Sequence, residues 1–211
     1  MLIFDLDGTL LDTSKDLHIA LNYALKKHNL KQKTLQETLL LLGNGIDMLV
    51  AGAIDNGKQN KDFDAIFSTF KSYYKDHIND YTAPYDGIIE LLQTLKQNNI
   101  KMGIISNKFD EGVKELHKKF FNNLIDYAQG VTPTIAKKPS PDAVFELIKK
   151  LDAQNEKNIY IGDSEVDIKT AYNANIPCIS VSWGFRSKEY LKSINAKTII
   201  NTPKELLNYI Y

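Results

Sequence analysis

The stretch that decides the fold is residues 2–9, Leu-Ile-Phe-Asp-Leu-Asp-Gly-Thr. Its first three residues form a short apolar run, which is typical of a buried strand. Asp5 and Asp7 follow this run, so both carboxylates are expected at the carboxyl edge of a sheet, where ligand sites of open α/β sheets form. Gly8 allows the backbone to turn sharply and to approach a ligand closely. The stretch therefore predicts a strand that ends in a binding site.

Further short apolar runs recur along the chain and alternate with segments of helical periodicity. The runs are Met102–Ile105, the weaker Ile125–Gly130, Ile159–Gly162, Ile176–Val181 and Thr198–Ile200. The helical segments are Asp86–Asn98, Lys108–Phe120, Pro141–Leu151, Val166–Asn173 and Ser187–Ile194. Ser140 and Pro141 are typical of an N-cap followed by proline at the first helical position. Because strands and helices alternate and the strands are almost continuously apolar, we expect an α/β fold with a doubly wound parallel sheet covered on both faces.

Residues 14–80 break this alternation. They contain no convincing strand, and helical spacing is followed by Leu17, Ala20, Leu21, Ala24, Leu25 and His28. Helical patterns continue through Leu35–Leu42, Ile46–Ile54 and Phe63–Ile78. We predict a helical domain at 14–81, inserted into a core domain formed by 1–13 and 82–211. Since both ends of an insert return to the same place, the expected hinges are Asp12–Ser14 and Tyr81–Tyr85.

A second pair of acidic residues follows another predicted strand. Asp163 comes directly after Ile159–Gly162 and Asp167 stands four residues further on, so the two share a face if a helix begins here. Clustered carboxylates repel one another, so a cation between them is expected. Hard oxygen ligands suit Mg²⁺. Two acidic strand ends in one sheet therefore predict a Mg²⁺ site.

Polar residues suited to a phosphate group stand at corresponding places. Ser106 and Asn107 follow the run Met102–Ile105, and Lys138 lies just before the predicted helix at Pro141. A hydroxyl, backbone N–H groups at a helix start and an ammonium group are the donors that a phosphate needs. The same edge of the sheet is therefore expected to bind a phosphate beside the metal.

Together these motifs resemble the haloacid dehalogenase superfamily of phosphatases. All four motifs of that family are present in order: Asp5-x-Asp7-Gly8-Thr9, Ser106, Lys138-Pro139 and Gly162-Asp163-x-x-x-Asp167. Each motif alone is weakly specific, but the four together across residues 5–167 are highly specific. The resemblance implies a Rossmann-like core, and the helical insert resembles a C1-type cap.

The resemblance also implies a role for each residue. Asp5 is the expected nucleophile, which forms an aspartyl-phosphate. Asp7 is the expected acid and base, and since a halide needs no proton on leaving, its presence favours a phosphate substrate. Mg²⁺ is expected on Asp5, the main-chain carbonyl of Asp7 and Asp163, with Asp167 as a further ligand or as a support of the site. The expected substrate-binding residues in the core are Thr9, Ser106, Asn107 and Lys138, although Thr9 could instead only cap a turn.

The insert carries a short motif that bears on the substrate. Gly43-Asn44-Gly45 resembles the phosphoglycolate phosphatase subfamily, and Pro84-Tyr85-Asp86-Gly87 is similar to its return hinge. N–H groups at a helix start near Ile46 and the Asn44 amide are suited to receive a carboxylate, although the glycines could simply turn the chain. The expected substrate is 2-phosphoglycolate. The alternative is a broad phosphatase for nucleotides, sugar phosphates or pyrophosphate.

Two other functions use related parts. A sugar-phosphate mutase of the same superfamily is expected to carry a histidine where this chain has Leu17. A receiver-like phosphate-binding signalling module also places an aspartate, a hydroxyl and a lysine on parallel strand tips. It lacks the acid at Asp7 and the large helical insert, and turnover of p-nitrophenyl phosphate distinguishes an enzyme from it.

Composition excludes further classes of function. The 211 residues carry 26 basic and 26 acidic side chains, so a broad basic surface for nucleic acid is not expected. No apolar run approaches the roughly 20 residues of a transmembrane helix, and no secretory signal is evident. These features predict a cytoplasmic protein with no membrane partner, as a monomer or a homodimer. The single cysteine, Cys178, and all four histidines (His18, His28, His77 and His117) are expected to be structural or surface residues.

Overall fold

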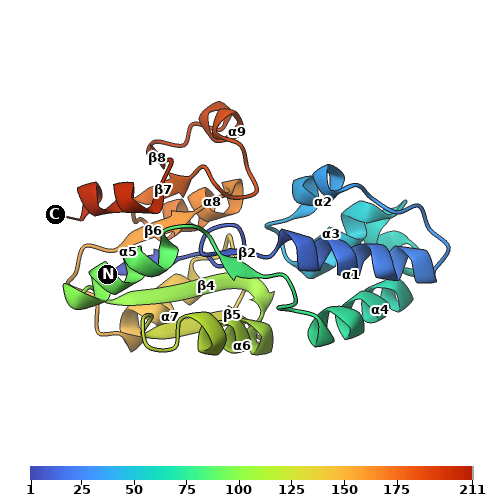
Figure 1. Ribbon diagram of the computed structural model, residues 1–211, viewed down its shortest axis with the longest axis horizontal. Helices are drawn as coiled ribbons and strands as arrows, with labels where there is room; N and C mark the ends of the chain where they lie inside the picture. Colours follow the sequence, from blue (N-terminus) through green and yellow to red (C-terminus); the bar gives the residue numbers. More distant parts are fainter. Residues whose placement is uncertain (211) are drawn as a thin grey trace.

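The computed structural model describes residues 1–210, and its centre is a six-stranded parallel sheet (Figure 1). The strands are β1 (Leu2–Phe4), β4 (Met102–Phe109), β5 (Tyr127–Val131), β6 (Ile159–Gly162), β7 (Cys178–Val181) and β8 (Ile199–Ile200). Their order is β5-β4-β1-β6-β7-β8, and all neighbours run parallel. The prediction of a doubly wound parallel sheet is confirmed. Because β1 lies between β4 and β6, the carboxyl ends of these three strands meet at one edge.

Helices cover both faces of this sheet. Alternate residues of β1 belong to different hydrophobic clusters, with Leu2 and Phe4 in one and Ile3 in the other. The first cluster includes buried residues of α5 (Ile88–Gln97) and α6 (Asp110–Phe120), and the second those of α7 (Asp142–Lys150) and α8 (Glu165–Asn173). The chain continues through α9 (Lys188–Ser193) and the short 3₁₀ helix η2 (Pro203–Tyr209). Within residues 1–210, no helix has the length and apolar character needed to span a membrane.

Four core helices, α5, α6, α7 and α9, begin one or two residues later than their sequence patterns predict. α7 begins at Asp142, with Pro141 as its N-cap residue, and the Ser140 hydroxyl accepts a 3.4 Å hydrogen bond from the Asp142 N–H. α6 begins at Asp110 because β4 continues through Phe109. Lys108 therefore belongs to the strand and not to the helix.

The insert forms a separate group of helices beside the end of the sheet, drawn in blue to teal in Figure 1. It consists of α1 (Ser14–Lys27), α2 (Leu35–Leu41), α3 (Ile46–Ala53), a 3₁₀ turn η1 (Gly57–Gln59) and α4 (Phe63–Asp76). α1 and α4 lie side by side: the rings of Tyr23 and Tyr73 stack at 4.1 Å, and His28 Nε2 lies 2.9 Å from Thr69 Oγ1. The apolar stripe predicted for α1 is buried at Leu17, Ala20, Leu21, Ala24 and Leu25.

The two connections between insert and core lie next to each other. Strand β2 (Leu11–Asp12) pairs antiparallel with β3 (Ala83–Pro84), which brings both predicted hinges together. Asp16 in α1 accepts hydrogen bonds from the backbone N–H groups of Tyr81 and Thr82 and from the Thr82 hydroxyl. The sequence did not reveal these strands because two residues are too few to show a periodicity.

Candidate active site

Three carboxylates meet at the carboxyl edge of the sheet. Asp5 follows β1, Asp163 follows β6, and Asp167 lies in the first turn of α8. One oxygen of each lies within 4.8 Å of the others, and all three residues are buried. Gly162 permits this approach, because a Cβ there would lie 2.3 Å from the Cβ of Asp167. The two acidic strand ends thus form one acidic cluster, which we define as Asp5, Asp163 and Asp167.

Lys138 is the cation that contacts the acidic cluster. Its Nζ donates hydrogen bonds of 2.7 Å to Oδ1 of Asp5 and to Oδ1 of Asp167. The other oxygen of Asp167 accepts a 2.6 Å hydrogen bond from the Ser164 hydroxyl, in a capping box at the start of α8. The Asp163 carboxylate accepts a 2.6 Å hydrogen bond from the backbone N–H of Phe185. One ammonium group therefore contacts two of three buried carboxylates.

The pKa values of the cluster reflect this excess of negative charge. Burial raises the pKa of Asp5 to about 7, against the opposing effect of Lys138 and with a further contribution from the Asp167 carboxylate. Burial, with repulsion from Asp167 and Asp5, raises the pKa of Asp163 well above its usual value. A bound cation would favour the charged forms, and an all-oxygen donor set suits Mg²⁺. The residues present therefore fit a divalent cation.

The Asp7 side chain lies outside the acidic cluster and has different partners. Its Oδ1 accepts a 2.7 Å hydrogen bond from Lys108 Nζ, and its Oδ2 accepts one of 3.3 Å from the Ser106 hydroxyl. Asp7 lines a small cavity together with Asp5, Ser106 and Asn107. Asp5 and Asp7 thus share a cavity, but only Asp5 also belongs to the acidic cluster.

Ser106 and Asn107 lie within β4, where its pairing with β5 is irregular. Both residues line the cavity. The Asn107 amide nitrogen lies 3.2 Å from the carbonyl of Lys138 and 3.3 Å from that of Gly43, and it donates to both. Asn107 therefore links the strand tip, the loop before α7 and the insert.

Three predicted substrate contacts, Thr9, Asn44 and Lys138, are not among the residues that line this cavity, although Lys138 contacts Asp5. Thr9 is buried, and its hydroxyl has no hydrogen-bond partner among the described residues. Its carbonyl accepts the indole N–H of Trp183 at 3.0 Å. The Asn44 side chain is exposed, whereas both glycines that flank it line the cavity. The Gly-Asn-Gly turn thus reaches the site through its backbone.

Lys108 is a site residue that the sequence did not predict, because it is the first residue of a segment with helical periodicity. Its side chain is 1% exposed, and its Nζ donates to Asp7 and, at 2.6 Å, to the hydroxyl of Tyr74 in α4. Burial lowers the pKa of Lys108, but Asp7 and Tyr74 outweigh burial and hold the pKa above its usual value. The one available signal was its place two residues after Ser106, at a strand tip.

Arg186, the one arginine of the chain, joins the insert to the core. Its guanidinium group pairs with Glu165 in α8, with Nε 3.0 Å from the carboxylate. It also donates to the carbonyls of Leu39 and Leu42, at 3.0 and 2.9 Å. Carbonyls at the end of a helix lack partners within the helix and attract cations. Arg186 therefore holds the end of α2 close to the acidic cluster.

The cavity between insert and core is narrow in this arrangement. Its volume is about 40 Å³, far below the roughly 300–1,000 Å³ of typical small-molecule pockets. On the side of the insert it is lined by Leu17, Leu42, Ile46 and Leu49. This arrangement therefore leaves no room for a typical small-molecule substrate.

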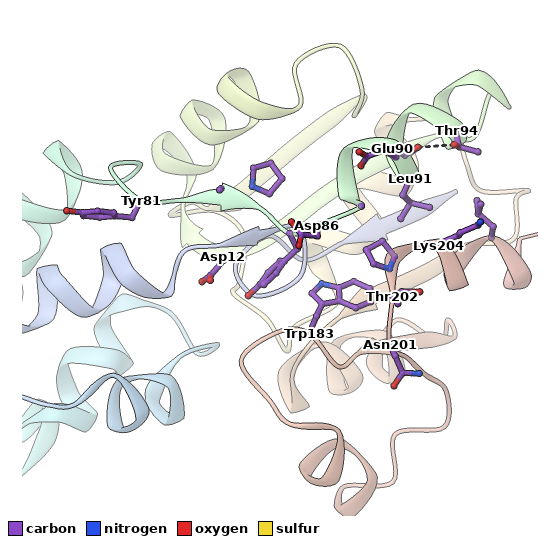
Figure 2. Close-up of a pocket in the computed structure, with 16 residues that line it drawn as sticks. Asp12, Tyr81, Asp86, Glu90, Leu91, Thr94, Trp183, Asn201, Thr202 and Lys204 are labelled. Atoms are coloured by element: carbon purple, nitrogen blue, oxygen red, sulfur yellow. Dashed lines mark hydrogen bonds between the residues drawn. The ribbon is translucent and has the colours of Figure 1, made fainter.

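A larger cavity, of about 880 Å³, lies on the hinge side of the molecule (Figure 2). Trp183, Asp86 and Leu91 are among the residues that line it, together with hinge residues Asp12 and Ala83. None of the residues of the acidic cluster lines it. The placement of the carboxylates, and not cavity size, therefore locates the candidate active site.

The chemistry available at this edge of the sheet is phosphate-ester hydrolysis. Asp5, Asp7 and the Ser106 hydroxyl line one cavity at this edge, and the Lys138 ammonium contacts Asp5. Neither a histidine nor a cysteine is among the residues that line the cavity, whereas two carboxylates and the Ser106 hydroxyl are. Fold and site together define a phosphatase.

Known proteins similar to this chain belong to the same class. The family profile for haloacid dehalogenase-like hydrolases matches residues 2–181. The chain therefore belongs to the haloacid dehalogenase-like hydrolase family. Membership of a family of enzymes favours an enzyme over a receiver-like signalling module.

Individual relatives cover almost the whole chain. It is 30% identical over 190 residues to a phosphoglycolate phosphatase of Aquifex aeolicus, covering 88% of this chain and 85% of that protein. It is 31% identical over 216 residues to the pyrophosphatase PpaX of Oceanobacillus iheyensis, covering 99% of this chain and 95% of that protein. A crystal structure of a candidate phosphoglycolate phosphatase from Lactobacillus delbrueckii subsp. bulgaricus matches with a TM-score of 0.94 at 35% identity, covering 99% of this chain and 97% of that one.

Proposed function

We propose that the chain is a Mg²⁺-dependent phosphomonoester hydrolase that acts through an aspartyl-phosphate on Asp5. The observation that carries this proposal is the double position of Asp5, which belongs to the acidic cluster and also lines the cavity. A phosphoryl group transferred to Asp5 would therefore stay next to the bound cation. Lys138, at 2.7 Å from Asp5, would neutralise part of its charge.

The reaction has two displacements at phosphorus. In the first, an oxygen of Asp5 bonds to phosphorus while the ester P–O bond breaks, and Asp7 gives a proton to the leaving oxygen. In the second, Asp7 takes a proton from water, whose oxygen bonds to phosphorus while the bond to Asp5 breaks. Inorganic phosphate is released, and the Asp5 carboxylate and protonated Asp7 are restored.

The remaining groups stabilise charge on the phosphoryl group. The hydroxyl of Ser106, the backbone of Asn107 and the ammonium of Lys138 would hold its equatorial oxygens, where charge is spread in the transition state. Asp163 and Asp167, with Asp5 and the Asp7 carbonyl, would hold Mg²⁺. The metal would supply electrostatic stabilisation of that charge.

The substrate that we favour is 2-phosphoglycolate. The support is the set of relatives with that activity in their names, among them one from Agrobacterium fabrum that is 32% identical over 189 residues. The backbone of the Gly-Asn-Gly turn, whose two glycines line the cavity, agrees with an anionic substrate. Pyrophosphate is the second candidate, because the pyrophosphatase relative matches 99% of the chain.

A panel of phosphate compounds with Mg²⁺ tests this proposal. The panel contains 2-phosphoglycolate, pyrophosphate, nucleotides, sugar phosphates and p-nitrophenyl phosphate, and kcat/KM is measured for each. We expect the highest value for 2-phosphoglycolate. A higher value for pyrophosphate would support the second candidate, and no turnover of any member would contradict the proposed hydrolase.

Replacing the proposed acid and base should slow the reaction strongly without abolishing it. Asp7→Asn removes proton transfer, which typically contributes about 10²–10⁴-fold. The loss in kcat/KM, which reports the first displacement, should be larger for an alkyl phosphate than for p-nitrophenyl phosphate, because nitrophenolate leaves without a proton. Steady-state kinetics on both esters measure this, and an unchanged kcat/KM on the alkyl phosphate would remove Asp7 from the mechanism.

A further inference from the structure

The Asp7 carboxylate belongs to a buried chain of three groups that crosses from the core to the insert. Lys108 Nζ lies 2.7 Å from Asp7 Oδ1 and 2.6 Å from the hydroxyl of Tyr74. The same ammonium lies 4.9 Å from the centre of the Tyr74 ring. Counted as whole residues, Lys108 is 3% exposed and Tyr74 is 0% exposed, so water has little access to either. We call this chain the Asp7–Lys108–Tyr74 relay.

The three members of the relay come from different parts of the fold. Asp7 follows β1 and Lys108 lies near the end of β4, both in the core, whereas Tyr74 lies in helix α4 of the insert. Tyr74 does not line the cavity, while Asp7 and Lys108 do. Any effect of the Tyr74 hydroxyl on the reacting atoms must therefore pass through Lys108.

We propose that Lys108 and Tyr74 are positioning residues that set the Asp7 carboxylate for proton transfer, so that a side chain of the insert controls the acid and base of the core. This inference rests on the proposed function of Asp7. Lys108 fixes one carboxylate oxygen while Ser106 contacts the other. The orientation of Asp7 toward the leaving oxygen thus depends on where the ammonium is held.

Charge gives Lys108 a second effect on the same step. When Asp7 passes its proton to the leaving oxygen, it becomes a carboxylate in a site with little water. An ammonium at 2.7 Å stabilises that product charge. Tyr74 keeps the ammonium beside Asp7, because its hydroxyl oxygen accepts from the same Nζ. Without the phenol oxygen, Lys108 loses a partner and is free to take another position.

The test compares an alkyl phosphate, whose leaving oxygen needs a proton, with p-nitrophenyl phosphate, whose leaving oxygen does not. The readout is kcat/KM, which reports the first displacement and excludes the second one, where Asp7 acts as base for both esters. For Tyr74→Phe we expect kcat/KM on the alkyl phosphate to fall about 10-fold, the lower end for losing a hydrogen bond to a charged group. On p-nitrophenyl phosphate kcat/KM should change less than about 2-fold. Lys108→Met should show the same split and a larger loss, up to about 100-fold.

Tyr73→Phe is the matched control, since Tyr73 is the neighbouring residue of α4 and stacks on Tyr23 and His77 away from the relay. It should leave both esters at wild-type rates. Thermal melts establish that each variant is folded, and Lys108→Met provides the comparison if Tyr74→Phe is unstable. Equal losses on both esters, or no loss on either, in a folded variant would overturn the inference.

The outcomes separate this inference from the proposed function. If the wild type hydrolyses neither ester, or if Asp7→Asn shows no preference between them, the proposed role of Asp7 is wrong. If Asp7→Asn shows the expected split and the folded Tyr74→Phe and Lys108→Met variants do not, the acid and base are correct and only the relay is refuted.

Discussion

Asp5→Asn should abolish turnover, with a fall in kcat of more than about 10⁴-fold, the scale seen when a nucleophile is removed. The amide is a poor nucleophile and a weaker ligand for a cation. Asp5 is also the one cluster member that lines the cavity, so no other carboxylate of the cluster can take its place. The decrease should appear for every substrate, including p-nitrophenyl phosphate, since no leaving group bypasses the nucleophile. Single-turnover kinetics with excess enzyme measure it.

The matched control is Asp12→Asn. Asp12 is exposed, and its carboxylate accepts hydrogen bonds from the backbone and hydroxyl of Ser14 at the start of α1. An asparagine oxygen can accept the same bonds, so kcat should stay near the wild-type value. If Asp5→Asn kept kcat within about tenfold of wild type, the loss expected of a missing nucleophile would be absent and Asp5 could not have that role.

Removal of metal should have the second large effect. EDTA should eliminate activity and Mg²⁺ should restore it. The acidic cluster holds three carboxylates, and the single ammonium of Lys138 contacts only Asp5 and Asp167, so negative charge remains for a cation to balance. Ca²⁺ should not restore activity, since its larger and looser ligand shell would misplace the nucleophile. Full activity in excess chelator would contradict the metal requirement.

Metal binding also has a readout that does not depend on activity. A ligand that binds only the folded state stabilises it by about 2.7 kcal/mol when its concentration is 100 times its dissociation constant. Mg²⁺ should therefore raise the melting temperature of the wild type. Asp163→Asn should lose most of this rise, whereas Asp12→Asn should keep it. An equal rise in both variants would place the ion elsewhere.

The dependence of this rise on pH follows from Asp5. Its folded-state pKa of about 7 lies above the ordinary 3.8, so the metal-free folded state holds this proton more tightly than the unfolded state. Its contribution to stability is present at acidic pH and is lost as pH rises from about 4 through about 7. Mg²⁺ competes with the proton, so the rise should be larger at pH 8 than at pH 5, and the reverse order would contradict this.

The sequence predicts the sheet well because its strands are short, apolar and bounded by polar residues. Ile159–Gly162 is predicted with the bounds of β6, and the acidic residues that follow it meet Asp5 as the parallel arrangement requires. The predicted extent of β4 was wrong because Ser106, Asn107 and Lys108, near its end, are polar and resemble a loop before a helix. Buried polar residues at a strand tip are common at functional sites, where pattern and structure diverge.

Contacts between distant segments could not be predicted at all. Tyr74 is 34 residues from Lys108, and Arg186 is 147 residues from Leu39. Local periodicity indicates that Tyr74 lies on a helix, but it does not indicate which strand that helix packs against. The Gly-Asn-Gly motif also does not indicate that the Asn44 side chain is exposed while its flanking glycines line the cavity.

The stereochemical course at phosphorus tests the central claim, a phosphoryl group carried by Asp5, most directly. A phosphorothioate monoester made chiral with ¹⁸O is hydrolysed in water enriched in ¹⁷O, and the configuration of the released thiophosphate is determined. Each in-line displacement inverts phosphorus, so two displacements through Asp5 predict net retention, whether or not the intermediate accumulates. Net inversion would show that water attacks the ester directly and would contradict the account.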